Sequence, residues 1–191
     1  MSKKHKNYSA LWVRDKKGIN LIVLVGYIVC AMMYGGIGYF VFSSGIGGDE
    51  AWKPILYYLL LVLPILSSLF DYKNVVNTDE FRYALYLPSL VFYLYLILFD
   101  YQYMYFIYAV FLICMSVIFL DMKFSSGITL SLFFIHIFGA AYLSYHGNTA
   151  RGERVFQAFS VLIMGISINL VMYFIRQIQR ERIRVISYER N

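Results

Sequence analysis

Six apolar stretches, each close to the length of a membrane span, fill most of this chain between Asn20 and Arg176. A helix needs roughly 20 predominantly apolar residues to cross the hydrocarbon core of a bilayer, and about 17 to 25 occur in practice. Most charged residues lie in the tails and in the short connections between these stretches. The pattern therefore predicts an all-α, polytopic membrane protein built as a six-transmembrane-helix bundle.

The apolar stretches also set the expected domain boundaries. The predicted spans are Ile19–Phe42, Pro54–Phe70, Tyr83–Phe99, Tyr103–Leu120, Gly127–Tyr145 and Val155–Ile175. They divide the chain into a basic N-terminal segment (1–18), a six-helix domain (19–175) and a juxtamembrane helix (176–191). We expect the first span to stay in place as an anchor, because it is longer than the apolar region of a cleavable signal peptide.

The distribution of Lys and Arg predicts the orientation. Short cytoplasmic loops of membrane proteins carry an excess of these residues. If the N-terminus is cytoplasmic, 14 of the 17 Lys and Arg residues face the cytoplasm, and only Lys53, Arg151 and Arg154 fall in outer loops. The sequence therefore predicts both termini in the cytoplasm of a multi-pass protein, most simply in a bacterial cytoplasmic membrane.

The basic clusters at the two ends of the chain have two interpretations. Such clusters occur in nucleic-acid-binding proteins, but here they flank membrane spans, where they lie against anionic headgroups. We therefore expect the lipid bilayer, and no nucleic acid, as their partner.

Aromatic and small residues suggest how the helices pack. Many of the 19 tyrosines, including Tyr57 and Tyr58, fall near predicted span ends, where a ring with a polar tip suits the headgroup boundary. Ala31 and Gly35 on the first span form a small-xxx-small pair that would let a neighbouring helix approach closely, and further small residues include Gly38 on the first span and Gly165 on the sixth. Packing within one bundle explains them, and homodimer formation is the alternative.

Few polar groups lie deep in the predicted spans, and these are the candidate ligand-binding residues. His136 could bind a ligand, respond to pH or help to bind a metal, or it could be a neutral imidazole bonded to a neighbouring Tyr or Ser. Asn169 suits an interhelical hydrogen bond. Deep tyrosines such as Tyr93 and Tyr105 should face other helices, or else line a cavity for a small apolar ligand.

No motif in the sequence predicts an enzyme or a bound cofactor. There is no Ser, His and Asp set at matching depth, no glycine-rich phosphate loop and no Cys/His spacing typical of zinc sites. Cys30 and Cys114 both lie in apolar spans, and we expect them to be buried free thiols.

The chain beyond the sixth span continues to Asn191 without Gly or Pro, so the last helix should run on into the cytoplasm. Val171, Ile178 and Val185 follow one another at heptad spacing, as in a short, imperfect coiled-coil seam. The alternative is a basic juxtamembrane helix that lies on the membrane surface. The residues that we expect to transmit a signal along this helix are Ile175, Ile178, Arg182 and Val185.

This layout of a basic tail, six Tyr- and Phe-rich spans and a charged helix continuing the last span resembles a known arrangement. It is similar to the six-helix membrane input or anchor region of bacterial signalling proteins such as diguanylate cyclases and sensor histidine kinases. The resemblance covers the whole chain and rests on layout. It implies a cytoplasmic effector, carried either on a longer chain or by a separate partner protein.

The sequence therefore predicts a non-enzymatic sensory or anchoring module that passes a signal through its last helix to a cytoplasmic effector. One alternative is the substrate-binding membrane subunit of a small-molecule transporter, which a copurifying vitamin-like ligand would favour. Another is an oligomeric channel or a defence-associated membrane effector, for which a symmetric oligomer with a hydrated axis would be decisive.

Overall fold

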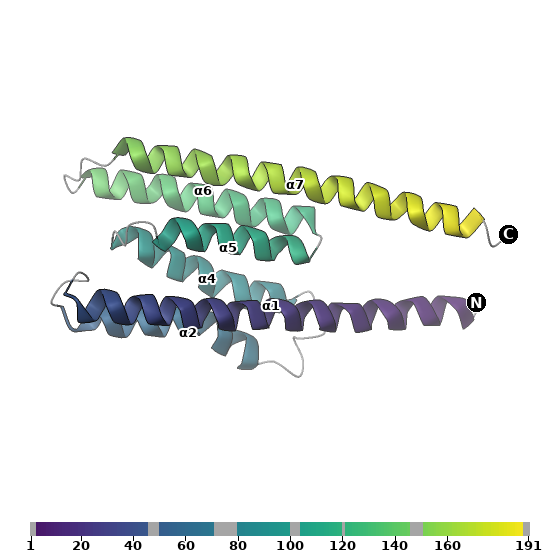
Figure 1. Ribbon diagram of the computed structural model, residues 1–191, viewed down its shortest axis with the longest axis horizontal. Coiled ribbons are helices and arrows are strands. Elements are labelled where there is room, and N and C mark those ends of the chain that lie inside the picture. Colours follow the sequence, from purple (N-terminus) through teal and green to yellow (C-terminus); the bar gives the residue numbers. More distant parts are fainter. Residues whose placement is uncertain are drawn as a thin grey trace. The chain divides into compact units, whose positions relative to one another are not determined.

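The computed structural model of the chain is helical almost throughout. It describes residues 3–45, 50–70, 80–99, 104–119, 121–145 and 151–188, with side chains except at 3–17, 70, 151, 179–180 and 182–188. Within these ranges the secondary structure consists of α-helices and contains no strand. The helices are α1 (Lys3–Ser43), α2 (Trp52–Phe70), α4 (Glu80–Leu98), α5 (Met104–Ile118), α6 (Met122–Tyr145) and α7 (Arg151–Tyr188), shown in Figure 1.

Five of these helices are long and apolar enough to cross a membrane. The qualifying segments, with mean hydropathies of 1.5 to 2.1, are Gly18–Ser43, Trp52–Leu69, Glu80–Leu98, Met122–Tyr145 and Gly152–Ile178. α5 is also apolar but has only 15 residues, or about 22 Å of helix, against a hydrocarbon core of about 30 Å. The structure confirms an all-helical, multi-pass membrane layout with five helices of spanning length.

α6 begins earlier than the apolar pattern predicts, at Met122 instead of Gly127. The Asp121 side chain accepts hydrogen bonds from the backbone N–H groups of Lys123 and Phe124, at 3.0 and 3.2 Å. A carboxylate in this position satisfies backbone donors that a helix start would otherwise leave open. Capping by Asp121 therefore sets the start of α6, and a hydropathy pattern contains no information on capping.

α1 and α7 also extend beyond the predicted spans. α1 is one helix of 41 residues that already begins at Lys3, and α7 is one helix of 38 residues. At 1.5 Å per residue, α7 is about 57 Å long. Hydropathy finds the part of a helix that suits hydrocarbon, and it does not register polar turns that continue the same helix.

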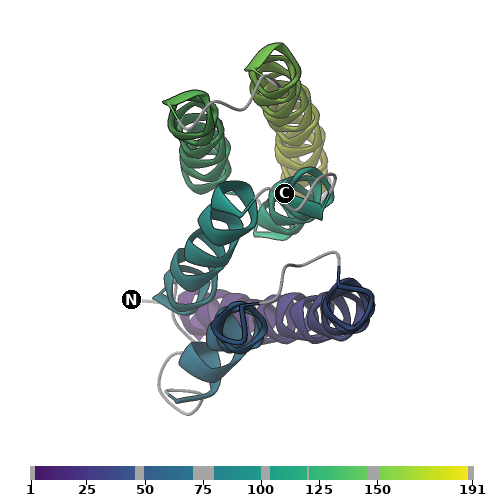
Figure 2. The ribbon, with the colours of Figure 1, turned by 90° about the vertical axis from the view of Figure 1, so that its left-hand side faces the viewer.

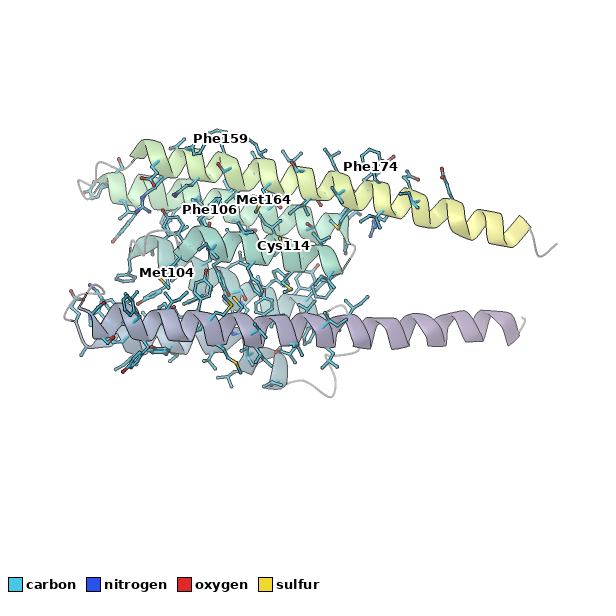
Figure 3. All side chains as sticks on the ribbon, viewed as in Figure 1. Met104, Phe106, Cys114, Phe159, Met164 and Phe174 are labelled. Atoms are coloured by element: carbon cyan, nitrogen blue, oxygen red, sulfur yellow. The ribbon has the colours of Figure 1, made fainter. Side chains whose placement is uncertain are left out.

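The outward faces of the helices are strongly apolar. Met32, Ile55 and Phe174 are 71%, 69% and 62% exposed, and Figure 3 labels Phe174 on α7. Water-soluble monomers rarely expose apolar surface this extensively. Acyl chains are the environment that these faces fit.

The two cysteines differ in their surroundings. Cys30 is buried, as expected, but Cys114 is exposed on α5, so the expectation of two buried thiols was wrong for Cys114. A thiol is a small, weakly polar group that suits a lipid-facing position as well as a packed one.

The chain divides into two compact units, residues 1–101 with α1, α2 and α4, and residues 102–191 with α5, α6 and α7. Contacts within each unit pair the end of one helix with the start of its neighbour, as between Tyr95 of α4 and Lys53 of α2 or between Ser116 of α5 and Ser125 of α6. Each unit is therefore an up–down–up arrangement of three helices.

Tyr57 lies at the centre of the first unit. Its ring contacts Phe42 and Phe92 edge to face, with centroids 5.4 and 5.3 Å apart, and its hydroxyl donates a hydrogen bond to the Tyr34 carbonyl at 2.8 Å. The ring lies directly against Gly38, where an added Cβ would overlap it. Tyr57 is only 1% exposed, so its phenol is used within the protein, where it ties α2 to α1.

Hydroxyl groups join α2 to α4 in the same way. Tyr95 donates to the Lys53 carbonyl at 2.9 Å, and Ser67 donates to the Ala84 carbonyl at 2.6 Å. Each bond uses a backbone oxygen of the neighbouring helix as the acceptor. Such interhelical bonds are typical of membrane proteins, where hydrocarbon offers no competing partner.

The second unit is held by small residues and buried hydroxyls, and Figure 2 views it from the end at which α6 leads to α7. Ser116 of α5 and Ser125 of α6 are fully buried, with their hydroxyl oxygens 3.0 Å apart. Gly165 of α7 lies against Thr129 of α6, so closely that a Cβ at Gly165 would overlap the Thr129 side chain. The glycine is what allows α6 and α7 to approach here.

Replacing Gly165 with Ala should reduce the free energy of unfolding by about 1 to 3 kcal/mol, because the added methyl forces α6 and α7 apart. Chemical unfolding in detergent micelles measures this. Gly127→Ala is the matched control, because an added Cβ there meets nothing within 4 Å. Combining Gly165→Ala with Thr129→Ala should recover part of the loss. Equal effects of Gly165→Ala and Gly127→Ala would contradict the close contact.

Candidate functional site

Only two basic side chains are buried among the described residues. The buried polar and charged residues are Asn20, Ser68, Ser89, Ser116, Ser125, Thr129, His136 and Arg154. His136 and Arg154, which are 2% and 4% exposed, both belong to the second unit. Ionisable groups within membrane helices mark functional sites by default, since their burial is costly.

His136 and Arg154 meet around Tyr105. The rings of Tyr105 and His136 pack edge to face, with centroids 5.5 Å apart and planes at 71°. The guanidinium carbon of Arg154 lies 5.6 Å from the centroid of the Tyr105 ring, within the range of cation–π attraction. The Tyr105 hydroxyl donates a hydrogen bond to Oε1 of Gln157 at 2.7 Å. These four residues, Tyr105, His136, Arg154 and Gln157, are called the Arg154 cluster below.

All three helices of the unit contribute to the cluster. Tyr105 is the second residue of α5, His136 lies in the second half of α6, and Arg154 and Gln157 lie one turn apart near the start of α7. Each of these helices contacts the other two. The cluster therefore lies where the three helices meet, toward the end at which α6 leads to α7.

Arg154 was not among the predicted site residues, because the sequence pattern predicted an outer loop at this position. Arg154 instead lies in the first turn of α7 and is buried. The buried residues that follow it on α7 are Ala158, Val161, Gly165 and Met172. Arg154 continues their spacing of three, four or seven residues, which is the helical period. That spacing is the signal by which the residue could have been found.

Of the four candidate ligand-binding residues, the structure brings together His136 and Tyr105. Tyr93 is fully buried but lies on α4, in the first unit. Asn169 lies on α7 about four turns beyond Arg154, and its amide nitrogen donates to a carbonyl one turn earlier in the same helix at 2.9 Å. The observed Asn169 bond is thus within one helix, and not between helices as predicted.

The candidate transmission residues lie on α7 beyond the cluster. Ile175 and Ile178 are 38% and 54% exposed. The backbone that carries Arg182 and Val185 is helical, but the side chains of these two residues lie outside the described part of the chain.

The Arg154 cluster combines a permanent positive charge, an imidazole, a phenol and an amide at one buried place. These four side chains can recognise an anionic or hydrogen-bonding ligand. The charge of the Arg154 guanidinium also makes the local packing of the helices sensitive to the groups next to it. Within the described ranges, no three His, Cys, Asp or Glu side chains gather closely enough to hold a metal ion.

Tyr105→Phe should lower the free energy of unfolding by about 1 to 2 kcal/mol, because the half-buried Gln157 oxygen loses its donor. Combining it with Gln157→Leu should restore part of this loss, since both polar partners are then removed. Tyr39→Phe is the control, because Tyr39 is 72% exposed, and it should change stability by less than about 0.5 kcal/mol. Additive losses from Tyr105→Phe and Gln157→Leu would show that the two side chains are not coupled.

No family model, curated protein or solved structure matches this chain. The resemblance to membrane input regions of signalling proteins therefore rests on the layout of the sequence, and it stays a prediction.

Proposed function

We propose that this chain is a non-enzymatic, membrane-embedded sensory or anchoring module whose last helix passes a change in the bundle to a cytoplasmic effector. In this proposal all six helices cross a bacterial cytoplasmic membrane, and both termini lie in the cytoplasm. The observation that carries the proposal is α7, one continuous helix with part of the Arg154 cluster at its start and a basic stretch at its end.

The packing of α5, which corresponds to the fourth predicted span, supports its crossing of the membrane. Ser116 meets Ser125 near one end of α5, and Tyr105 meets His136 near the other, so α5 runs beside α6 for most of its length. A helix shorter than the hydrocarbon core is accommodated by local thinning of the bilayer or by polar flanking residues. A crossing by α5 also puts Lys123 on the side of the basic termini, in keeping with the positive-inside rule.

The length and continuity of α7 support its role as the transmitting element. Arg154 and Arg176 lie on the same helix, about 33 Å apart along its axis. α7 contains no proline, the commonest cause of a sharp kink. A shift or tilt at the cluster is therefore carried to the basic end, as in the helix displacements of 1–2 Å that many allosteric proteins use.

The buried charge of Arg154 makes the packing of the cluster sensitive to a ligand or to the state of the lipid. A guanidinium inside a membrane protein is stable only with partners that offset its lost hydration. A ligand or lipid state that interacts differently with two packings of Tyr105, His136 and Arg154 would shift the balance between them. The position of the basic end of α7 would then depend on which of the two packings is more populated.

Distance measurements between spin labels on α6 and α7 test the transmission. In the full chain carrying Cys30→Ser and Cys114→Ser, labels are attached at Lys123→Cys and Ile178→Cys, both exposed positions of one unit. Gln157→Leu in the cluster should move the mean label distance in lipid nanodiscs by about 1–2 Å or split its distribution.

Ser160→Ala is the matched control. Ser160 lies one turn further along α7, and among the described residues its hydroxyl bonds to the Phe156 carbonyl of its own helix, at 2.9 Å, so the distances should stay as in the parent chain. If Gln157→Leu leaves them equally unchanged, α7 does not transmit the state of the cluster.

A further inference from the structure

A groove lies between the start of α6 and the middle of α7, within the second unit. Figure 1 shows these two helices side by side. Its volume is about 380 Å³, within the range of small-molecule pockets in proteins. Its lining residues are Met122, Ser126, Ile166, Asn169, Leu170 and Tyr173. Both helices belong to the apolar, span-length segments here, so the groove lies on the membrane-embedded part of the chain.

The groove is open on one side and almost wholly apolar. Ile166, Leu170 and Tyr173 are 52%, 55% and 45% exposed. Asn169 is the main polar group in its wall, and its Oδ1 atom is buried without a hydrogen-bond partner among the described residues. A hollow of this kind suits a flexible hydrocarbon chain better than a rigid polar molecule.

Basic residues lie at one end of the groove. Lys123 directly follows Met122 and is exposed, and Arg176 lies one turn beyond Tyr173 and is half-buried. Gln177 donates a hydrogen bond to the Tyr173 hydroxyl at 2.9 Å, which adds a polar edge at the same end. The nearby Asp121 carboxylate is occupied by capping α6.

We propose that this groove binds an anionic phospholipid, with one acyl chain along Ile166 and Leu170 and the phosphate held by Lys123 and Arg176. The apolar wall fits the chain, and the two cations match the charge of the headgroup. A second copy of the protein would bring another apolar helix to this place and leave both cations without a complementary charge. The proposal does not depend on which side of the membrane holds this end of α7.

Quenching of a single tryptophan by brominated lipids tests the site. The full chain carries Trp12→Phe and Trp52→Phe, with one new tryptophan introduced by Tyr173→Trp in the groove. It is reconstituted into vesicles containing equal mole fractions of brominated phosphatidylglycerol or brominated phosphatidylcholine. We expect about a tenfold binding preference for phosphatidylglycerol, from two basic residues at the membrane surface.

Two controls test whether the preference for phosphatidylglycerol arises at the groove. Lys123→Gln with Arg176→Gln should reduce it to less than about twofold, whereas Lys53→Gln with Arg82→Gln, which removes the same charge elsewhere, should leave it intact. A reference tryptophan from Phe138→Trp, at a position of α6 that is 56% exposed, should be quenched equally by both lipids.

Three results would overturn the proposal. The first is equal quenching of the groove tryptophan by both lipids. The second is a preference that survives Lys123→Gln with Arg176→Gln. The third is absence of quenching by either lipid together with crosslinking between copies through Leu170→Cys, which would show that a second copy covers the groove.

Discussion

The absence of water in a bilayer core governs how this chain is held together. A hydroxyl or carbonyl facing hydrocarbon loses its hydration, so it must find a partner within the protein. Tyr57, Tyr95 and Ser67 donate to backbone carbonyls of a neighbouring helix, and Ser116 pairs with the Ser125 hydroxyl. Polar contacts between helices here come from uncharged groups, whose burial costs far less than that of ions.

The same constraint explains why close helix contacts fall at a few small residues. Apolar side chains gain little by leaving lipid for protein, so dense packing must supply the association energy. Gly38 admits the Tyr57 ring and Gly165 admits Thr129. Other glycines on the same helices, such as Gly36, have open space around them, and they carry no such role.

Against this background the Arg154 cluster is an exception that calls for a functional explanation. A guanidinium, an imidazole and a phenol share one buried place in a unit otherwise joined by hydroxyls and small residues. Arg154 and Gln157 belong to the same continuous helix as the basic stretch that follows the sixth predicted span, which is the basis of the proposed transmission. The proposed lipid groove lies further along the same helix, so lipid binding would act on the same element.

Hydropathy predicted the helices because it measures their fit to hydrocarbon, and each predicted span overlaps one observed helix. It could not predict the extra turn that Asp121 caps, or the shortness of α5. His136 and Tyr105 were recognised as candidate residues, although Tyr105 lies at the start of α5 and not deep in the span, and nothing local in the sequence shows that the two residues meet. Arg154 was misplaced because a charged residue near the end of a span was assigned to a loop. It nevertheless follows the spacing of the buried residues of α7.

Labelling of single cysteines with a membrane-impermeant maleimide tests the six-span topology most directly. In the full chain carrying Cys30→Ser and Cys114→Ser, cysteines replace Lys6, Lys53, Lys73, Lys123 and Arg151 one at a time. Our account predicts labelling in intact cells at positions 53 and 151 only, and at the other three only after the membrane is permeabilised. Labelling of position 123 in intact cells would show that α5 does not cross as proposed, and labelling of positions 6 and 73 would reverse the orientation on which transmission to a cytoplasmic effector depends.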